Sequence, residues 1–222
     1  MMASLKLSAG FRFSVVAILG LLSLSFQAKA ITLDFQSLDG TVVNFAGNST
    51  FNFTSTNGYQ FSISSVIGGV GDSVGLNGYV APGGPFTIGG ITTNGGLQSA
   101  SVTGTSTLHI TDKGTNDLTG TITWISIGTV NVLGVLDLNG QVNLSNIAYP
   151  VGTNNDLGAL AAAGSGEDVV TFQFVPAKDL TTLATVGGFT SYSGSITSVP
   201  EPNTMVLALA GIFTFLSIRR RK

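Results

Sequence analysis

Hydrophobic and polar residues alternate through the middle of the chain, between residues 31 and 198. Clear examples are Phe51-Asn52-Phe53, Phe61-Ser62-Ile63 and Val170-Thr171-Phe172-Gln173-Phe174. A period of two residues is typical of β-strands, and helical periodicity is almost absent. Clusters of Gly and Asn, such as Thr56-Asn57-Gly58, separate the strands at intervals typical of a sandwich. We therefore predict one all-β domain over residues 31–198, an antiparallel β-sandwich of jelly-roll type with one or two short helices.

Two short helices and a long loop are expected within this domain. A helix is predicted over residues 156–163, with Asp156 as its N-cap and Gly164 just past its end. A further single helical turn is expected to start at Asp179. The Gly-rich stretch 68–96 is expected to loop out over one edge of the sheets.

One hairpin can be given a register around the turn-rich segment 112–117. Pairing Leu108 with Ile122 places apolar partners on one face of this hairpin. The same register places His109 opposite Thr121, on an outer face that is rich in threonine.

A second hairpin is predicted around Asn139-Gly140-Gln141. A three-residue loop at this point lets Leu138 face Val142 and Leu136 face Leu144, which a two-residue Asn-Gly turn would not do.

Residues 1–30 have the features of a secretory signal peptide. Lys6 and Arg12 supply a positive start, and an uncharged apolar stretch follows over residues 13–26. Ala28 and Ala30 are small residues at the positions that a signal peptidase requires. We expect cleavage after Ala30, so that the mature chain is exported and has no leader.

The C-terminal end of the chain has the features of a membrane anchor. Residues 203–218 carry no charge, and the chain then ends in Arg219, Arg220, Arg221 and Lys222. A helix of this length reaches about 24 Å, somewhat less than the hydrocarbon thickness of about 30 Å, and the basic side chains can supply the difference. We predict a transmembrane helix over residues 204–218 with the basic tail 219–222 as a cytoplasmic stop.

A proline-rich segment, residues 199–202, stands just before this stretch. Pro200 and Pro202 flank Glu201, and two prolines prevent both a continuing helix and a central strand. This motif therefore predicts an extended segment that a protease can reach.

The last 24 residues strongly resemble the sorting region of the PEP-CTERM proteins of Gram-negative bacteria. In that family a Pro-Glu-Pro motif, a short transmembrane helix and a basic tail follow one another in the same order. The resemblance implies an exosortase, a membrane protease that removes the anchor, as a partner. It also implies an association with exopolysaccharide or biofilm production.

Composition and charge exclude several kinds of chemistry. The chain has no Cys, which excludes disulfides, thiolate metal sites and cysteine nucleophiles, and its single histidine, His109, excludes a multi-histidine metal site. Residues 31–198 hold ten acidic residues against two basic ones, a net charge of −8. A surface of that sign repels phosphate backbones, so we expect no nucleic-acid partner.

No catalytic residue or cofactor is assigned. His109 is expected on an exposed face without an acidic partner, and only it could serve a Ser-His-Asp triad. Glu167 and Asp168 could serve a glycoside hydrolase, but in a strand they point to opposite faces. We expect them to be solvated loop acids.

Two binding chemistries remain open. Calcium could find hard oxygen ligands in either of two loops, but we assign no metal site, because ordinary turn chemistry explains the same residues. These residues are Asp112, Asn116 and Asp117 in one loop, and Asn154, Asn155 and Asp156 in the other. Aromatic rings could serve sugar binding, with Trp124 expected in the core and Tyr79 and Tyr149 expected outside. Tyr59 and Tyr192 are the other candidates.

These observations predict a non-enzymatic, exported cell-surface or extracellular-matrix protein. Its expected partners are the export machinery, an exosortase-type protease, the membrane through the C-terminal helix, and extracellular polysaccharide. The alternative is a carbohydrate-binding or calcium-dependent binding module, with a glycoside hydrolase less favoured.

Overall fold

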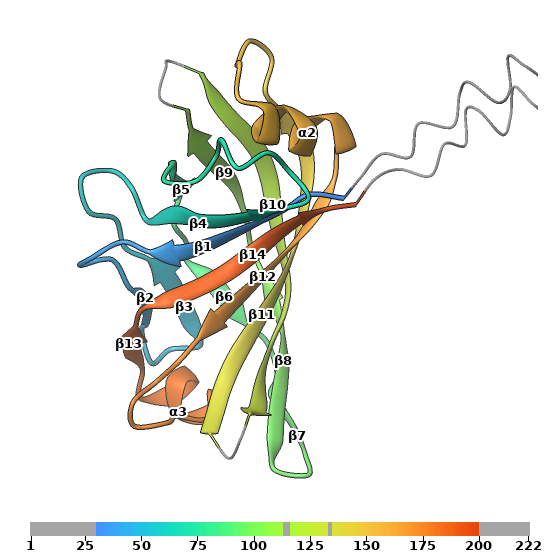
Figure 1. Ribbon diagram of the computed structural model, residues 1–222. Coiled ribbons are helices and arrows are strands. Elements are labelled where there is room, and N and C mark those ends of the chain that lie inside the picture. The colour runs from blue at the N-terminus through green and yellow to red at the C-terminus, as the bar shows by residue number, and fades with distance from the viewer. Residues whose placement is uncertain (1–29, 113–115, 133–134, 200–222) are drawn as a thin grey trace, which may run out of the picture. The chain divides into compact units, whose positions relative to one another are not determined.

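The computed structural model describes residues 30–112, 116–132 and 135–199, and most regular structure in these ranges is β-strand (Figure 1). The strands are β1 (Thr32–Ser37), β2 (Val43–Phe45), β3 (Thr50–Phe53), β4 (Phe61–Ile67), β5 (Asn77–Ala81), β6 (Phe86–Ile88), β7 (Thr92–Asn94), β8 (Leu97–Thr103), β9 (Thr105–Thr111), β10 (Asp117–Val132), β11 (Val135–Ala148), β12 (Gly166–Phe172), β13 (Gly188–Thr190) and β14 (Tyr192–Ser198). The helices are α2 (Asn155–Ala163) and α3 (Leu180–Thr185).

Eight of these strands close into a barrel. They pair in the order β11-β12-β14-β1-β4-β5-β9-β10, and β10 pairs back with β11. The all-β prediction is confirmed, and the predicted sandwich is corrected to a closed ring. Alternation along a strand cannot separate the two folds, because both bury one face of each strand.

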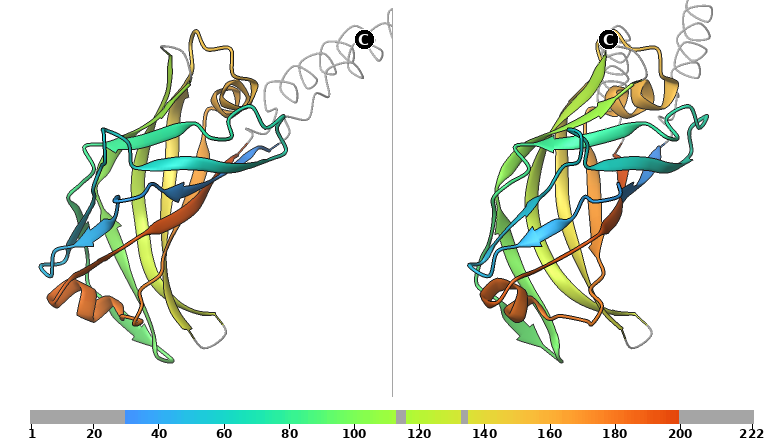
Figure 2. Two further views of the ribbon diagram at one scale, coloured as in Figure 1. Left: turned by 60° about the vertical axis from the view of Figure 1, so that its left-hand side comes forward. Right: turned by 90° about the vertical axis from the view of Figure 1, so that its left-hand side faces the viewer.

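Strand β10 belongs to the ring and to a second sheet. Its residues 117–123 pair with β9, whereas Ser126, Ile127 and Gly128 pair with β8. The second sheet continues from β8 through β6, β3 and β2 to β13. The two views in Figure 2 show the long strands running past both sets of shorter strands. A 16-residue strand makes this double pairing possible.

The two sheets share one hydrophobic core. Phe51 and Phe53 of β3 point toward the inward-facing rings of the barrel. The ring centroid of Phe51 lies 4.9 Å from that of Trp124, and the centroid of Phe53 lies 4.9 Å from that of Tyr192. Phe172 lies among the same rings, 6.4 Å from Phe53. These buried aromatic side chains therefore fill much of the interior that the structure describes.

The first and last strands of the described core are neighbours. Strand β1 pairs with β14, and the backbone N–H of Ile31 donates to Ser198 Oγ at 2.8 Å. The N–H of Ser198 donates in return to the carbonyl of Ile31 at 2.8 Å. Residues 31 and 198 therefore lie together at one end of this strand pair, as Figure 1 shows for the blue and red strands.

The predicted register of the first hairpin is wrong by two residues. Leu108 lies opposite Gly120, and Thr111 pairs with Asp117. The connecting loop is shorter than expected, and the N–H of Asp112 donates across it to the carbonyl of Asn116. A shift of two residues preserves the period of the strands, so the predicted inward and outward faces remain correct.

The predicted second hairpin is also wrong. Asn139-Gly140-Gln141 lies within β11 and makes no turn, and Val142 pairs with Trp124 of β10. The glycine has a packing role: a Cβ at Gly140 would lie 2.4 Å from the indole ring of Trp124. A glycine that leaves room for an aromatic ring has the same sequence signature as a turn glycine.

The predicted helices are confirmed, with one change of cap. The N-cap of α2 is Asn154, whose side-chain oxygen accepts from the N–H of Leu157 at 3.0 Å, whereas Asp156 lies inside the helix. Gly164 ends α2 in the left-handed conformation, and Asp179 caps α3. The stretch 68–96 is more ordered than expected, because it includes β5, β6 and β7.

Candidate functional site

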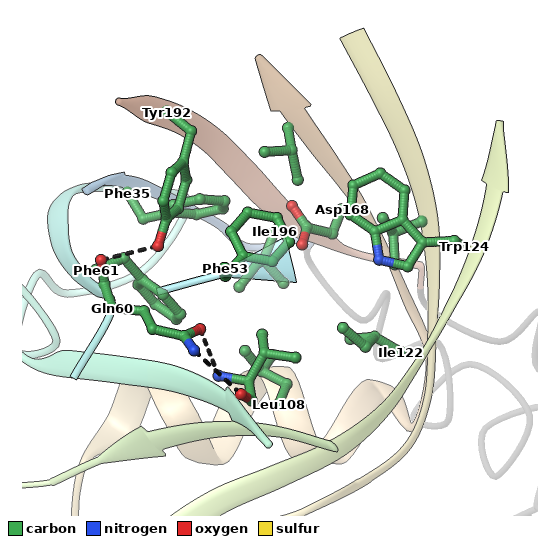
Figure 3. A pocket seen from close by; sticks show the side chains of 13 residues that line it. Phe35, Phe53, Gln60, Phe61, Leu108, Ile122, Trp124, Asp168, Tyr192 and Ile196 are labelled. Carbon is green, nitrogen blue, oxygen red and sulfur yellow. Dashed lines mark hydrogen bonds between the residues drawn. The ribbon is translucent and has the colours of Figure 1, made fainter. Parts of the chain in front are cut away.

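A small cavity lies among the described residues in the interior of the barrel. Its volume is about 20 Å³, which is room for about one water molecule. Figure 3 shows the side chains that surround it, among them Phe53, Trp124, Asp168 and Tyr192. The bulky aromatic side chains leave no space there for a ligand of the size of a sugar or a nucleotide.

Asp168 is an acidic residue that lines this cavity. It is 8% exposed, and burial raises the pKa of its carboxyl group to about 7. Among the described residues, no hydrogen bond reaches its Oδ1 atom or the Nε1 atom of Trp124. The prediction that Glu167 and Asp168 face opposite sides is confirmed, but the expectation that Asp168 is a solvated loop acid is wrong. In the sequence, Asp168 lies two and four residues before the apolar Val170 and Phe172, so the alternation of the strand already indicates that it points inward.

The other polar groups around the cavity are bonded. The phenol of Tyr192 donates to the backbone carbonyl of Gln60 at 2.8 Å. The side chain of Gln60 accepts from the N–H of Val80 at 2.8 Å and donates to the carbonyl of the same residue at 3.2 Å. Burial raises the pKa of Tyr192 above its ordinary value. These bonds fix the side chains where β4, β5 and β14 approach each other.

A polar groove lies where β1 ends and β14 begins. Its volume is about 640 Å³, within the range of about 300–1,000 Å³ that is usual for ligand sites. The residues that line it are Gln36, Ser37, Leu38, Asp39, Gly40, Thr41, Val42, Asp137, Thr171, Gln173, Ser191, Tyr192 and Ser193. We call this set the polar groove.

Three adjacent strands supply part of the lining of the polar groove. Thr171 of β12 lies directly opposite Ser193 of β14, which in turn lies opposite Gln36 of β1. These residues alternate with the inward-facing Phe172, Tyr192 and Phe35, so their side chains point outward. The loop after β1 carries Asp39, which is exposed.

Asp137 of β11 completes the lining on the other side. Its Oδ1 atom is inaccessible to solvent and receives no hydrogen bond from the described residues, and the same holds for Oδ1 of Asn139. Asn139 lies directly opposite Thr171. Sequence reasoning missed the polar groove, although the polar residues between inward-facing aromatics in Thr171-Phe172-Gln173-Phe174 could have indicated an outer polar face.

The side chains of the first calcium candidate have separate partners. The phenol of Tyr149 donates to Asp112, and the amide of Asn116 donates to the carbonyl of Val151 at 3.3 Å. Asp117 lies next to His109. Within the ranges that the structure describes, no three acidic or histidine side chains form a metal-binding group.

The second calcium candidate forms structural contacts. The carboxylate of Asp156 accepts hydrogen bonds from backbone amides of the segment 70–73, and Asn154 caps α2. Asp72 accepts from the backbone and side-chain amides of Asn155. These oxygens are therefore engaged in joining a loop to a helix.

His109 has an acidic neighbour, contrary to expectation. Its Nδ1 lies 3.6 Å from Oδ2 of Asp117, because the two-residue shift in register brings Asp117 into the strand. The ring of His109 stacks on that of Tyr79, with centroids 4.5 Å apart, and Tyr59 lies 6.3 Å from Tyr79. Burial, and then the charge of Asp117, raise the pKa of Tyr79. Trp124 is in the core as predicted, and Tyr79 and Tyr149 are half-buried.

The predicted processing sites lie outside the described residues, except for Ala30. They are Ala28, Pro200, Glu201, Pro202, Arg219, Arg220, Arg221 and Lys222. The expected span, residues 204–218, lies outside them as well. None of the helices in the described ranges is long and apolar enough to cross a membrane.

Comparisons with protein-family models, with curated proteins and with solved structures found no match for this chain.

Proposed function

We propose that this protein is a non-enzymatic, exported cell-surface or extracellular-matrix protein that is sorted through its C-terminus and associates with exopolysaccharide or biofilm. The observation that carries the proposal is the order of three features at the C-terminus. Pro200-Glu201-Pro202 precedes the uncharged stretch 204–218, and the basic tail 219–222 ends the chain. Together with the N-terminal leader, this order describes a route through the inner membrane.

The proposed route has two processing steps. The export machinery carries the chain across the membrane, and the leader is removed after Ala30. The C-terminal helix then holds the domain at the inner membrane until an exosortase-type protease cuts near Glu201. The released domain reaches the cell surface or the extracellular space.

Two properties of the domain support this route. Residues 31 and 198 are hydrogen-bonded neighbours, so the strands that connect to the leader and to the sorting region meet at one end. The interior is filled by aromatic side chains, so the outer faces carry the groups that a partner can reach.

Fractionation of a host that produces the full chain tests the proposal. In a host without an exosortase we expect the chain in the inner membrane, with Ile31 as its first residue by mass spectrometry. In a host with the exosortase we expect a shorter chain at the cell surface or in the medium. A chain that keeps Met1, or that is released equally by both hosts, contradicts the proposal.

A carbohydrate-binding module is the second candidate. The observation that favours it is the polar groove, whose outward-facing hydroxyl, amide and carboxylate groups suit the hydroxyls of a sugar.

A further inference from the structure

The polar groove presents side chains that have no hydrogen-bonding partner among the described residues. Gln36, Asp39, Gln173, Ser191 and Ser193 are exposed, and in the described part of the chain their side chains make no hydrogen bond. They include donors, in the amides and hydroxyls, and acceptors, in all of them. A ligand that bonds to this set must itself carry both donors and acceptors.

The charge of the polar groove excludes an acidic ligand. Asp39 and Asp137 contribute two carboxylates, and none of the described residues that line the groove is basic. The whole of residues 31–198 carries a net charge of −8, so a polyanion would be repelled at long range as well. An uncharged ligand with many hydroxyls meets these conditions.

The polar groove is poorly suited to a peptide. A peptide strand can add to a sheet only at a free edge, but β12 pairs with β11 and β14, and β14 pairs with β12 and β1. Peptide side chains are usually anchored in apolar pockets. The apolar side chains with partial exposure along the groove are only Leu38 and Val42, both half-buried.

The geometry of the residues that line the polar groove suits an extended polymer. Thr171, Ser193 and Gln36 stand in one row on neighbouring strands, which are about 4.8 Å apart. Evenly spaced polar groups of this kind can contact successive sugars of one chain. Asp137 adds a half-buried carboxylate, and because its Oδ1 atom is inaccessible to solvent, a ligand can reach this carboxylate only through Oδ2.

From these observations we infer that the polar groove binds an uncharged polysaccharide, with Asp137, Gln173 and Ser193 as hydrogen-bonding residues. The inference rests on the proposed function, because it supplies a ligand for an exported domain.

The polar groove lies at the opposite end of the β1–β14 pair from residues 31 and 198. Gln36 and Ser193 pair with each other five residues from Ile31 and Ser198 along β1 and β14. At about 3.4 Å per residue, the groove lies about 17 Å from the end where the chain leaves the domain.

Affinity electrophoresis of the full chain, purified in detergent, tests the inference. The gels contain a soluble uncharged glucan, galactan or mannan, with alginate as a polyanion and an oligolysine peptide as competitor, all in buffer with EDTA. We expect retardation by at least one uncharged polymer, none by alginate, and no competition by the peptide. Retardation by alginate alone, displacement by the peptide, or no retardation by any uncharged polymer overturns the inference.

Variants locate the binding. Gln173→Ala and Ser193→Ala are expected to weaken binding by up to about tenfold each. Asp137→Asn is expected to weaken it by about tenfold or more, because a hydrogen bond to a charged acceptor is stronger. The matched controls are Asn143→Ala and Ser195→Ala, on the same outer faces of β11 and β14 but outside the groove; we expect changes of less than about twofold.

Circular dichroism and the thermal midpoint check that each variant is folded, and the exposed Ser193 supplies the variant least able to disturb folding. Equal effects in the groove and control variants, or none in either, overturn the inference. These measurements are made in vitro, so they can fail while export and processing succeed, and the reverse also holds.

Discussion

Asp72 and Asp156 each bind the backbone of the segment that carries the other. The carboxylate of Asp72 accepts from the N–H of Asn155 at 2.7 Å and from the N–H of Asp156 at 3.1 Å. The carboxylate of Asp156 accepts from three N–H groups of the segment 70–73, at 2.7, 3.0 and 3.1 Å. The loop after β4 and the start of α2 are thereby joined at a point more than eighty residues apart in the chain.

Replacing the buried member of this pair is expected to be costly. Asp156 is 1% exposed, and Asp156→Ala leaves three backbone N–H groups without their charged acceptor. We expect a loss of about 3 kcal/mol in the free energy of unfolding, measured by urea denaturation of the full chain. Asp39→Ala removes an exposed aspartate as a control. An equal effect of the two substitutions would show that the bonds of Asp156 contribute nothing.

Burial of Asp168 predicts that stability falls as the pH rises. Its pKa is raised to about 7 in the folded protein, while an unfolded chain has an ordinary value of about 3.9. The contribution of Asp168 to the free energy of unfolding is therefore most favourable below about pH 4. It falls as the pH rises from about 4 to about 7, and above pH 7 the protein is less stable by up to about 4 kcal/mol.

Asp168→Asn removes this ionisation and keeps the shape of the side chain. We expect the variant to be more stable than the parent at pH 8 and about equal to it at pH 4, by urea denaturation at each pH. Glu167→Gln is the matched control, because Glu167 is the exposed neighbour on the opposite face of β12. Parallel pH profiles for the parent and Asp168→Asn would refute the prediction.

The close packing of Gly140 against Trp124 predicts that even one added methyl group is destabilising. A Cβ at Gly140 would lie 2.4 Å from the indole, so Gly140→Ala forces the ring or the strand to move. We expect a loss of about 2 kcal/mol in unfolding free energy. Gly158→Ala is the control: outside its own helix backbone and chain neighbours, no described heavy atom lies within 4 Å of its Cβ position in α2, and a gain of up to about 1 kcal/mol is expected there. Thermal unfolding of both variants measures the two effects. A midpoint that shifts in the same direction for Gly140→Ala and Gly158→Ala would contradict the prediction.

Substitutions in the sorting motif and in the basic tail are expected to impair different steps of processing. Glu201→Ala leaves the apolar stretch intact, so we expect normal insertion but impaired release in a host with the exosortase. Neutral residues at positions 219–222 remove the cytoplasmic stop, so the tail should slip across the membrane and correct processing should fall. Fractionation separates the two results. Release of the Glu201 variant at the level of the parent would mean that the motif is only a spacer.

The sequence by itself determined the features that depend on neighbouring residues. The period of two in Val170-Thr171-Phe172 gave β12 its two faces, and it correctly placed Glu167 and Asp168 on opposite sides. The helix that ends at Gly164 and the turn after Asp179 were found because helix caps act within a few residues. Trp124 was placed in the core for the same local reason, since it shares the inward phase of its strand.

Only the tertiary structure decided the features that depend on pairing between distant strands. The closure of β10 on β11, the place of Gly140 under Trp124, and the clamp between Asp72 and Asp156 each join segments that no local pattern connects. The polar groove arises in the same way, because Gln36 and Ser193 meet only when the first and last strands pair. Alternation fixes which face of a strand is buried, but the partner of that strand depends on the packing of the whole chain.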